Sequence, residues 1–368
     1  MTAPSSNGAA AAPGILFFGG YDPAYPRNAV IRKGWAKCGF ASSECRAGTR
    51  LKVHLRYPAL LWRYVWIHDS SRVVFVPDFR HKDVPLAWAI ARCTHRHLVF
   101  DPLVSRYETR VLDREDVSPG SAQERHNRNL DRTSMKLADL VLADTGAHAR
   151  FYASEFSVPG AKIKVLPVGF DEDKFVEAPF PDGGGACSVL FYGTYLPLHG
   201  VETIVEAAAI LRDAPVTFVL VGGGQTLETA RSKARGLPGG KITFRAPVSE
   251  AELGRLIAHA HIVLGIFGTT PKARLVVPNK VYQALAVGRA LITAETPAIG
   301  EIFKSGVHLD TVPPGDASAL AGAIASLMRD PARMRRLADA GGSYVRSEFN
   351  SRRIAEKLFA ILEEERFL

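Results

Sequence analysis

One loop in the second half of the chain has the residues to hold a phosphate. Residues 191–200 read FYGTYLPLHG, and a run with helical spacing follows them. A strand, a glycine turn and a helix can present backbone N–H groups to an anion, and the helix dipole adds to the attraction. From this loop we take Gly193, Thr194 and His199 as candidates, with His199 as a hydrogen-bond donor or, if its pKa is raised, a cation. The alternative is a loop closed by Gly200 for geometry, with His199 in solvent.

A second candidate anion site lies in VPNKVYQALAVGRALIT, residues 277–293. Pro278 suits a first helical turn. A lysine at that turn, Lys280, opposes the helix dipole and costs local stability, which a bound anion would offset. Upstream, TTPKAR adds Lys272 and Arg274. We expect these three cations to neutralise a diphosphate; the alternative is a Lys280 that faces solvent.

Glycines and polar residues also follow the apolar runs of the first half of the chain. Each one alone is more readily a loop or capping residue than a functional one, but they share a position after a strand. Because the carboxyl ends of parallel strands meet at one edge of a sheet, we expect them to rim one crevice. The residues are Gly19, Gly20, Arg27, Asn28, Asp78, Arg80, His81, Asp101, Arg106 and Tyr107.

The elements that must position these residues are short apolar runs separated by helical segments. The runs are continuous and not alternating, which is typical of parallel strands covered on both faces. They lie at 15–20, 72–78, 97–102, 140–145 and 164–169, and then at 188–193, 216–224, 241–247, 261–267, 289–295 and 308–312. The pattern predicts an α/β fold with two Rossmann-like parallel-sheet domains facing each other across a cleft.

The domain boundaries follow from composition. We expect a disordered leader at 1–14, an N-terminal domain at 15–170, a linker at 171–188 and a C-terminal domain at 189–347. Prolines and three consecutive glycines mark the linker. A final segment, 348–368, has apolar residues at helical spacing, and we expect this helix to pack back toward the N-terminal domain.

The composition of the chain indicates which classes of ligand the protein can bind. The formal net charge is +9 and the pI is about 9.4, which favours anionic partners such as nucleotide phosphates or acidic lipid headgroups. Nucleic acid is disfavoured, because no helix-turn-helix, zinc-finger or RNP pattern is present. The four cysteines show no metal-binding spacing and indicate a reducing cytoplasm. No run approaches the roughly 20 apolar residues of a membrane span.

The motifs together resemble a known family. The stretch ADLVLADTGAHARFYASEFSVPGAKIKVLPVGFDEDKF, residues 138–175, resembles the end of the N-terminal domain of family 4 (group 1) retaining glycosyltransferases with the GT-B fold, and Gly169, Asp171 and Phe175 fit its pattern. The segments VLFYGTYLPLHGVETIVEAAAIL, FVLVGGG, QALAVGRALIT and VPPGDASALAGAIASLMRDPARMRRLA resemble that family's C-terminal domain. The resemblance covers 138–347 well and 15–137 more loosely.

The resemblance implies a metal-independent transfer of a sugar from a nucleotide-diphosphate sugar, a UDP- or GDP-sugar, to a hydroxyl acceptor, with no cofactor. It implies a donor site in the C-terminal domain and an acceptor site in the N-terminal domain. The donor site is assigned to Gly193, Thr194, Gly223, Pro247, Val248, Lys272, Arg274, Asn279 and Gln283, the acceptor site to Gly19, Gly20, Arg27, Arg80, Arg106 and Tyr107, and catalysis to Asp101, Lys280 and His199.

The expected acceptor is a cell-envelope or lipid-linked glycan or another small molecule. A cytoplasmic enzyme at the inner face of the membrane, in peripheral contact with anionic lipid, would fit the basic surface.

The chain departs from the family's pattern at several positions. The family's phosphate loop carries an arginine and a lysine where Thr194 and His199 stand here, and its paired glutamates fall at Leu275 and Gln283. The family's histidine after an N-terminal strand corresponds to Asp101. We interpret the chain as a divergent branch whose cations moved to the 272–280 region. The alternatives are an epimerase or hydrolase of the same fold and a nucleotide-sugar binding protein without catalysis.

Overall fold

The computed structural model describes residues 14–67, 70–181 and 185–368, and these form two parallel sheets of six strands each. The strand order is β2-β1-β3-β4-β5-β6 in the N-terminal sheet and β12-β11-β10-β7-β8-β9 in the C-terminal sheet. The strand order thus reverses beside the first strand of each sheet, as in doubly wound folds. Apart from Gly14, the leader expected at 1–14 lies outside the described residues.

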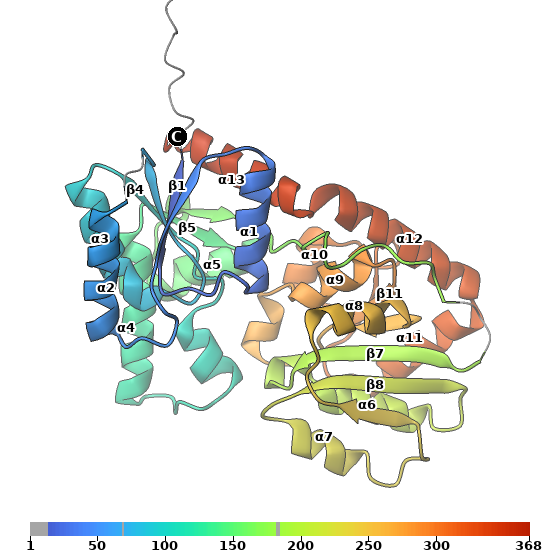
Figure 1. The fold of residues 1–368 in the computed structure, drawn as a ribbon. Helices are drawn as coiled ribbons and strands as arrows, with labels where there is room; N and C mark the ends of the chain where they lie inside the picture. Colours follow the sequence, from blue (N-terminus) through green and yellow to red (C-terminus); the bar gives the residue numbers. More distant parts are fainter. Residues whose placement is uncertain (1–13, 68–69, 182–184) are drawn as a thin grey trace, which may run out of the picture.

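The central strands of the N-terminal sheet are short runs that are buried on both faces. Its strands are β1 (Ile15–Gly19), β2 (Ser42–Arg46), β3 (Val73–Val76), β4 (His97–Phe100), β5 (Leu140–Ala143) and β6 (Ile163–Val165). Helices α1 (Pro26–Lys37), α2 (Val53–Val65), α3 (Val84–Cys93), α4 (Ala122–Leu137) and α5 (Gly146–Phe156) pack around it (Figure 1). The short segment η2 (Glu108–Asp113) lies between β4 and α4.

The C-terminal sheet repeats this construction. Its strands are β7 (Cys187–Thr194), β8 (Val216–Gly223), β9 (Ile242–Arg245), β10 (Ile262–Leu264), β11 (Ala290–Ala294) and β12 (Asp310–Val312). Its helices are α6 (Val201–Ile210), α7 (Leu227–Lys233), α8 (Glu250–Ala258), α9 (Asn279–Ala286), α10 (Pro297–Ile302), α11 (Ala317–Arg329) and α12 (Pro331–Glu348), with the single turns η4 (Pro197–His199) and η5 (Pro271–Arg274).

The sequence-based prediction missed β2, α1 and α2. The strand β2 reads SSECR and has a single buried residue, so it carries no apolar run. Helix α1 begins at Pro26, where the missing N–H of proline costs nothing. Residues 19–28, expected as a loop, therefore include the first turn of a helix.

The chain crosses between the two sheets at two places that lie side by side. Phe170 donates its N–H to the carbonyl of Phe349 at 3.1 Å. Beyond the crossing, Glu172 accepts from the Ser351 hydroxyl, and Phe175 is buried. The first part of the expected linker is thus packed against the end of the chain.

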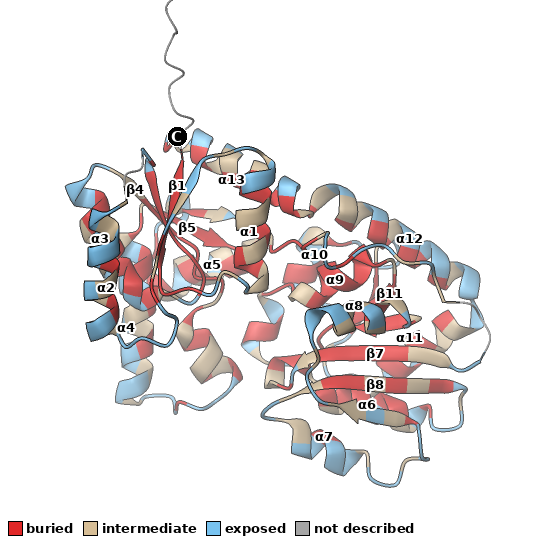
Figure 2. Ribbon diagram, viewed as in Figure 1, coloured by how far each residue is buried: buried red, intermediate tan, exposed pale blue. Residues whose placement is uncertain are grey.

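The last helix, α13 (Ser351–Glu364), packs against α1 on the N-terminal sheet. A Cβ on Gly34 would lie 1.8 Å from the Ser351 carbonyl oxygen, so this approach requires glycine. The rings of Phe40 and Phe359 stack beside it at 4.4 Å. Burial is concentrated in the two sheets and the helix faces that cover them (Figure 2).

Candidate functional site

A pocket of about 530 Å³ lies between the two domains, at the carboxyl edges of both sheets. Loops that follow β5 and β7, the η2 and η5 segments and the start of α9 all contribute to it. Seven residues predicted from the sequence line it: Gly193, Thr194, His199, Lys272, Asn279, Lys280 and Gln283. The crevice between strand ends therefore exists, and its C-terminal wall contains most of the predicted donor residues.

The glycines of the 193–200 loop are required by close approaches. Gly193 has φ +146°, and a Cβ there would lie 3.1 Å from the Lys280 Nζ. Gly200 has φ +60°, and a Cβ there would lie 2.5 Å from the backbone carbon of Phe267. Both values lie in the region that favours glycine. The loop is therefore held tightly between α9 and the segment after β10.

Lys280 stands in the first turn of α9 with its ammonium inside the protein. The side chain is 5% exposed, and the Nζ has no hydrogen-bond partner among the residues that the structure describes. It lies 4.0 Å from the centre of the Phe191 ring, a cation–π contact. Burial holds the pKa of Lys280 well below its ordinary value. A buried ammonium without an acceptor is costly, and an anion in the pocket would remove that cost.

Lys272 is a second buried cation at the same pocket. Its Nζ donates to the Thr109 hydroxyl at 2.8 Å, so it joins η5 of the C-terminal domain to η2 of the N-terminal domain. Burial lowers the pKa of Lys272, while Glu108 and Asp113 act in the opposite direction. Arg114, which the sequence did not suggest, lines the pocket as well.

The structure does not support a charged His199. Burial, together with nearby Lys280, lowers the pKa of His199 well below its ordinary value, so the ring is neutral at pH 7. Its Nδ1 accepts from the Leu196 N–H at 3.4 Å, and the ring also bonds to the backbone of Thr194. His199 therefore stabilises the 193–200 loop by hydrogen bonds to its backbone and does not supply a positive charge for a phosphate.

Other predicted donor residues lie outside the interdomain pocket. Arg274 is exposed and lines a separate hollow beside Thr296 and Phe303, although it is only two residues from Lys272. Successive residues of a turn point to different sides, which separates these two cations. Gly223, Pro247 and Val248 also do not line the interdomain pocket.

Arg27, a predicted acceptor residue, and Asp101 interact with each other. Arg27 and Asp101 form an ion pair at 2.6 Å, and both side chains are fully buried. Arg27 also donates to the Leu166 carbonyl. Neither residue lines the pocket. The structure therefore does not place Arg27, the predicted acceptor-binding residue, or Asp101, the predicted catalytic residue, at the pocket, and their two charges neutralise each other.

The remaining predicted acceptor residues face other parts of the N-terminal domain. Arg106 donates to Asn127 of α4, and the Tyr107 ring carries a cation–π contact from Arg128. The Gly20 N–H donates to Asp83 at 2.9 Å. The predicted residues that do not line the pocket on this side are Gly19, Gly20, Arg27, Asn28, Asp78, Arg80, His81, Asp101, Arg106 and Tyr107. Tyr25 and Phe79 form the aromatic wall instead.

Asp144 is a further charged residue that lines the pocket. Thr145 is the cap of α5, since its hydroxyl accepts from the His148 N–H. Asp144 instead contacts His148 Nδ1 at 2.6 Å, and Glu108 contacts His148 Nε2 at 2.7 Å. Burial opposes a charged imidazole, but these two carboxylates raise the pKa of His148 to about 9. The order of residues along the chain gives no signal for such a cluster.

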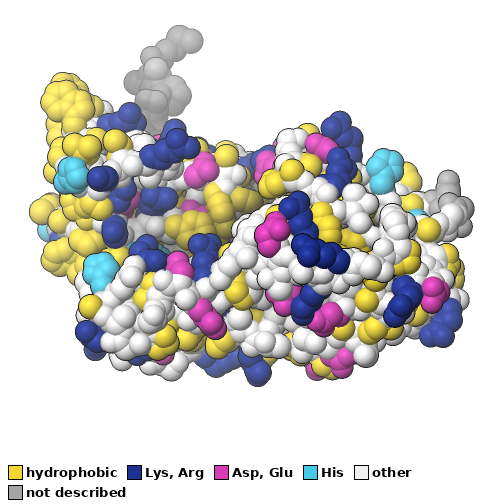
Figure 3. Space-filling model, turned by 90° about the horizontal axis from the view of Figure 1, so that it is seen from below, with side chains coloured by type: hydrophobic (Ala, Val, Ile, Leu, Met, Phe, Trp, Pro, Cys, Tyr) yellow, Lys and Arg dark blue, Asp and Glu magenta, His cyan; other side chains and the backbone are white. Residues whose placement is uncertain are grey.

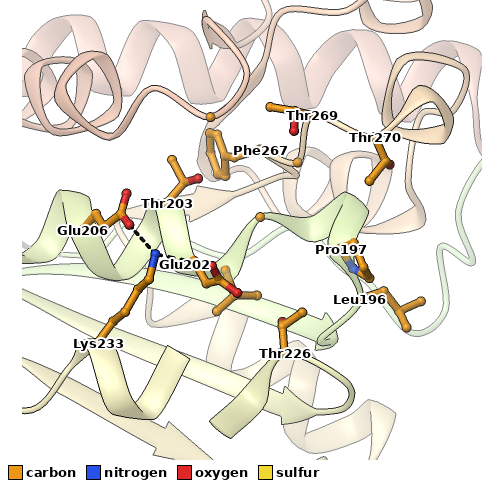
Figure 4. Close-up of a pocket in the computed structure, with 14 residues that line it drawn as sticks. Leu196, Pro197, Glu202, Thr203, Glu206, Thr226, Lys233, Phe267, Thr269 and Thr270 are labelled. Atoms are coloured by element: carbon orange, nitrogen blue, oxygen red, sulfur yellow. Dashed lines mark hydrogen bonds and ion pairs between the residues drawn. The ribbon is translucent and has the colours of Figure 1, made fainter. Parts of the chain in front are cut away.

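A second pocket, of about 430 Å³, opens on the other side of the 193–200 loop (Figure 4). Its cation, Lys233, is neutralised by Glu202 and Glu206 at 3.3 and 2.5 Å. Figure 4 shows these three side chains turned toward one another. This pocket therefore has no spare positive charge for a phosphate, unlike the interdomain pocket.

Two searches of the described residues gave negative results. No group of three or more His, Cys, Asp or Glu side chains in residues 14–67, 70–181 and 185–368 is arranged to hold a metal ion. Within the same residues, no helix combines the length and the apolar character needed to cross a membrane.

Comparison with known proteins identifies the C-terminal half by sequence. Residues 186–330 match the family described as glycosyl transferases group 1. A phosphatidyl-myo-inositol mannosyltransferase of Mycobacterium leprae is 28% identical over 196 residues, 51% of this chain and 50% of that protein. The probable glycosyltransferase WbjE of Pseudomonas aeruginosa is 25% identical over 168 residues, 43% of this chain and 39% of its own length. The chain thus spans half or less of these curated relatives.

Solved structures match over almost the whole chain. A sucrose-phosphate synthase from Thermosynechococcus elongatus has a TM-score of 0.73 at 17% identity, covering 96% of this chain and 98% of that one. Anabaena HepE in complex with UDP and glucose has a TM-score of 0.71 at 15% identity, covering 96% and 100%. These likenesses confirm the predicted fold. Residues 186–330 are thus similar to the group 1 glycosyl transferases, and the two six-stranded parallel sheets have the fold of GT-B glycosyltransferases.

Proposed function

We propose that the protein is a retaining glycosyltransferase that moves a sugar from a nucleotide-diphosphate sugar to a hydroxyl acceptor. The observation that carries this proposal is Lys280, a buried ammonium at the pocket between the domains for which the described residues offer no hydrogen-bond acceptor. A diphosphate is the group that would satisfy it. The family match in residues 186–330 supports the same class of ligand.

The chemistry requires stabilisation of a leaving diphosphate. The bond from the anomeric carbon to the diphosphate oxygen breaks, a bond to the acceptor oxygen forms, and the acceptor's proton passes to a diphosphate oxygen. Lys280, Lys272 and the N-terminal turn of α9 would stabilise the charge that develops on the leaving group. They do so in a buried setting, where electrostatic interactions are stronger than in water. No side chain in this scheme needs to bind a metal ion.

The donor is proposed to be a UDP-sugar, with a GDP-sugar as the alternative. The structural relative HepE was solved with UDP and glucose and with UDP-glucose. Gln283 lies at the pocket, where its Oε1 accepts from the Tyr192 hydroxyl at 3.1 Å and its amide group can donate to a ribose hydroxyl.

The proposed acceptor is a cell-envelope or lipid-linked hydroxyl compound, and the proposed location is the inner face of the membrane. The name of the mannosyltransferase relative supports a lipid acceptor. The aromatic wall of Tyr25 and Phe79 would suit the face of a sugar ring, since apolar faces of sugars pack on aromatic rings.

Calorimetric titration with UDP, GDP and ADP tests the donor site, and one of the three is expected to bind in the micromolar range. Incubation of the matching nucleotide-sugar with candidate acceptors then tests transfer, and NMR of the product gives the anomeric configuration. Retention supports the proposal. Absence of binding by all three nucleotides would refute it.

One observation favours a second function, donor binding without transfer. Leu275 stands where the family has its first glutamate, and it packs with Leu198 and Val276 in a small apolar cluster. That position offers no carboxylate. Tight nucleotide-sugar binding with no product against a broad acceptor panel would support this alternative, whereas donor consumption without acceptor would indicate a hydrolase or epimerase.

A further inference from the structure

Helix α2 exposes an apolar face that the proposed transfer does not use. Trp62 is 69% exposed and Val65 is 71% exposed, on a helix whose other side is buried through Arg56 and Leu60. We call the exposed set the α2 face; its members are Leu51, Leu55, Leu61, Trp62, Val65 and Trp66. Isolated exposed apolar residues are ordinary, but a contiguous set of this kind marks an interaction surface.

The arrangement of this face follows from helical geometry. Leu55, Trp62 and Trp66 lie at positions i, i+7 and i+11, which fall on one side of a helix. The rings of Trp62 and Trp66 contact each other edge to face, with centres 5.8 Å apart. Figure 3 shows hydrophobic side chains gathered at the end of the molecule where Figure 1 places α2.

The sequence that carries the α2 face is mainly basic, although Arg56 is paired with Asp83 and Arg46 lies 3.9 Å from Glu44. From Arg46 to Arg72 the sequence contains six arginines or lysines and one acidic residue, Asp69. Four of the basic residues, Arg50, Lys52, Arg63 and Arg72, are exposed. Tryptophan and leucine flanked by basic residues is the composition of helices that lie in the surface of an anionic bilayer.

Charge also argues against a second copy of this chain as the occupant. A two-fold contact through α2 would bring the exposed Arg50, Lys52 and Arg63 near the same residues of the other copy. Like charges in contact cost several kcal/mol at an interface. An anionic lipid surface matches both the apolar and the basic residues, with about 1 kcal/mol of attraction for each lysine or arginine near it.

The buried side of α2 is fixed to the edge of the sheet where the interdomain pocket opens. Arg56 forms an ion pair with Asp83 at 2.7 Å, and Asp83 also accepts the N–H of Gly20 at the end of β1. The Tyr57 hydroxyl donates to the Lys82 carbonyl. The N-terminal end of α2 in a docked protein would therefore lie at the carboxyl edge of the N-terminal sheet, the edge at which the interdomain pocket opens.

We infer that the α2 face docks the protein onto an anionic lipid bilayer, with Leu55, Trp62 and their apolar neighbours in the headgroup region and Arg50, Lys52 and Arg63 on the lipid phosphates. Docking needs no step of the proposed transfer. If the protein does not bind membranes, the proposed nucleotide site is unaffected. If it does not bind nucleotides, the inference about docking is unaffected.

Vesicle co-sedimentation of the full chain tests this inference, with phosphatidylcholine vesicles that contain phosphatidylglycerol compared with pure phosphatidylcholine vesicles. The variant Leu55→Ser/Trp62→Ser and the charge reversal Arg50→Glu/Lys52→Glu are each expected to weaken binding to the anionic vesicles at least about tenfold. Matched controls are Val176→Ser/Ile210→Ser, at residues 62% and 55% exposed, and Arg212→Glu/Arg235→Glu, both exposed in the C-terminal domain. Thermal unfolding by circular dichroism shows that each variant is folded.

The expected outcome is strong binding to anionic vesicles by the wild type and both controls, and loss in both α2 variants. Quenching of tryptophan fluorescence by brominated lipid, lost in the Trp62 variant, gives a second measurement. Failure of the wild type to bind, or equal binding by the α2 variants and their controls, overturns the inference. A wild-type dimer in light scattering that Leu55→Ser/Trp62→Ser makes monomeric also overturns it, in favour of self-association.

Discussion

Replacing Lys280 with methionine should weaken nucleotide binding while leaving the free protein at least as stable. The ammonium is 5% exposed, has no hydrogen-bond partner in the described part of the chain and has a pKa held low by burial. Methionine has a similar length and removes the buried charge. An unpaired buried polar group costs about 1–3 kcal/mol, and the cation–π contact with Phe191 offsets about 0.5–2 kcal/mol of that. The midpoints of the two ranges, about 2 and about 1.2 kcal/mol, leave an expected rise in the free energy of unfolding of about 1 kcal/mol, with an upper limit of about 2.5 kcal/mol.

The effect on binding should have the opposite sign. A charge-assisted hydrogen bond to a diphosphate contributes about 1.5–3 kcal/mol, which corresponds to a Kd about 10 to 150 times higher for the methionine variant. Calorimetric titration gives the Kd, and chemical denaturation gives the free energy of unfolding. A gain or no change in stability with a loss of affinity is the result expected of a residue kept for its ligand.

Lys241 provides a matched control. It is also 5% exposed, but its Nζ donates to the Ala214 carbonyl at 2.8 Å, and it precedes β9 at the opposite edge of the C-terminal sheet. Lys241→Met should cost about 1 kcal/mol of stability and leave the Kd unchanged. If Lys280→Met changes the Kd less than threefold, or destabilises the protein as much as Lys241→Met does, the reasoning is wrong.

Three other predictions follow from the same structure. A bound diphosphate would raise the low pKa of Lys280, so nucleotide binding should take up protons and weaken as the pH rises from neutral to alkaline. Calorimetry in buffers of different ionisation enthalpy measures the proton uptake. Zero uptake by the wild-type protein would contradict the prediction. The pKa of His148 is raised to about 9 in the folded protein. Its stabilising contribution of about 3 kcal/mol should therefore be complete below about pH 6.5 and be lost as the pH rises to 9. NMR titration of ¹⁵N-labelled histidine measures the pKa, and a value near 6.5 would show that Glu108 and Asp144 do not hold the proton. Gly34→Ala should destabilise the protein by more than about 3 kcal/mol, since the added Cβ would meet the Ser351 carbonyl. Gly39 has open space around it but φ +73°, so Gly39→Ala should cost only about 1 kcal/mol. Thermal unfolding measures both variants, and equal effects would mean that α1 and α13 do not pack as closely as described.

The C-terminal domain could be predicted well from the sequence because its strands are continuous apolar runs that end in glycine or polar residues. The runs at 188–193 and 216–224 became β7 and β8 with almost the same bounds. Residues directly after such strands, or at the first turn of the next helix, must lie at the carboxyl edge of the sheet. This geometry placed Thr194 and Lys280 at the pocket without knowledge of the rest of the structure.

The N-terminal residues could not be placed in the same way, because being near a strand end does not decide between the pocket and the core. Arg27 and Asp101 are 74 positions apart, and only the folded chain shows that they pair with each other. Helix α2 was missed for a different reason. Its apolar residues lie on the solvent side as well as the buried side, so the usual amphipathic pattern is absent.

In the proposed donor site, Lys280 takes the place of the cations that the 193–200 loop lacks. The Lys280 side chain extends from α9 toward the 193–200 loop. A Cβ placed on Gly193 would lie 3.1 Å from its Nζ. The charge is thus delivered to the same place by a different element. Since Lys280 also lowers the pKa of His199, a second cation at position 199 would repel the first at close range. The neutral histidine and the relocated lysine are therefore consistent as a pair, and adding the family's lysine back through His199→Lys should destabilise the free protein unless Lys280 is removed as well.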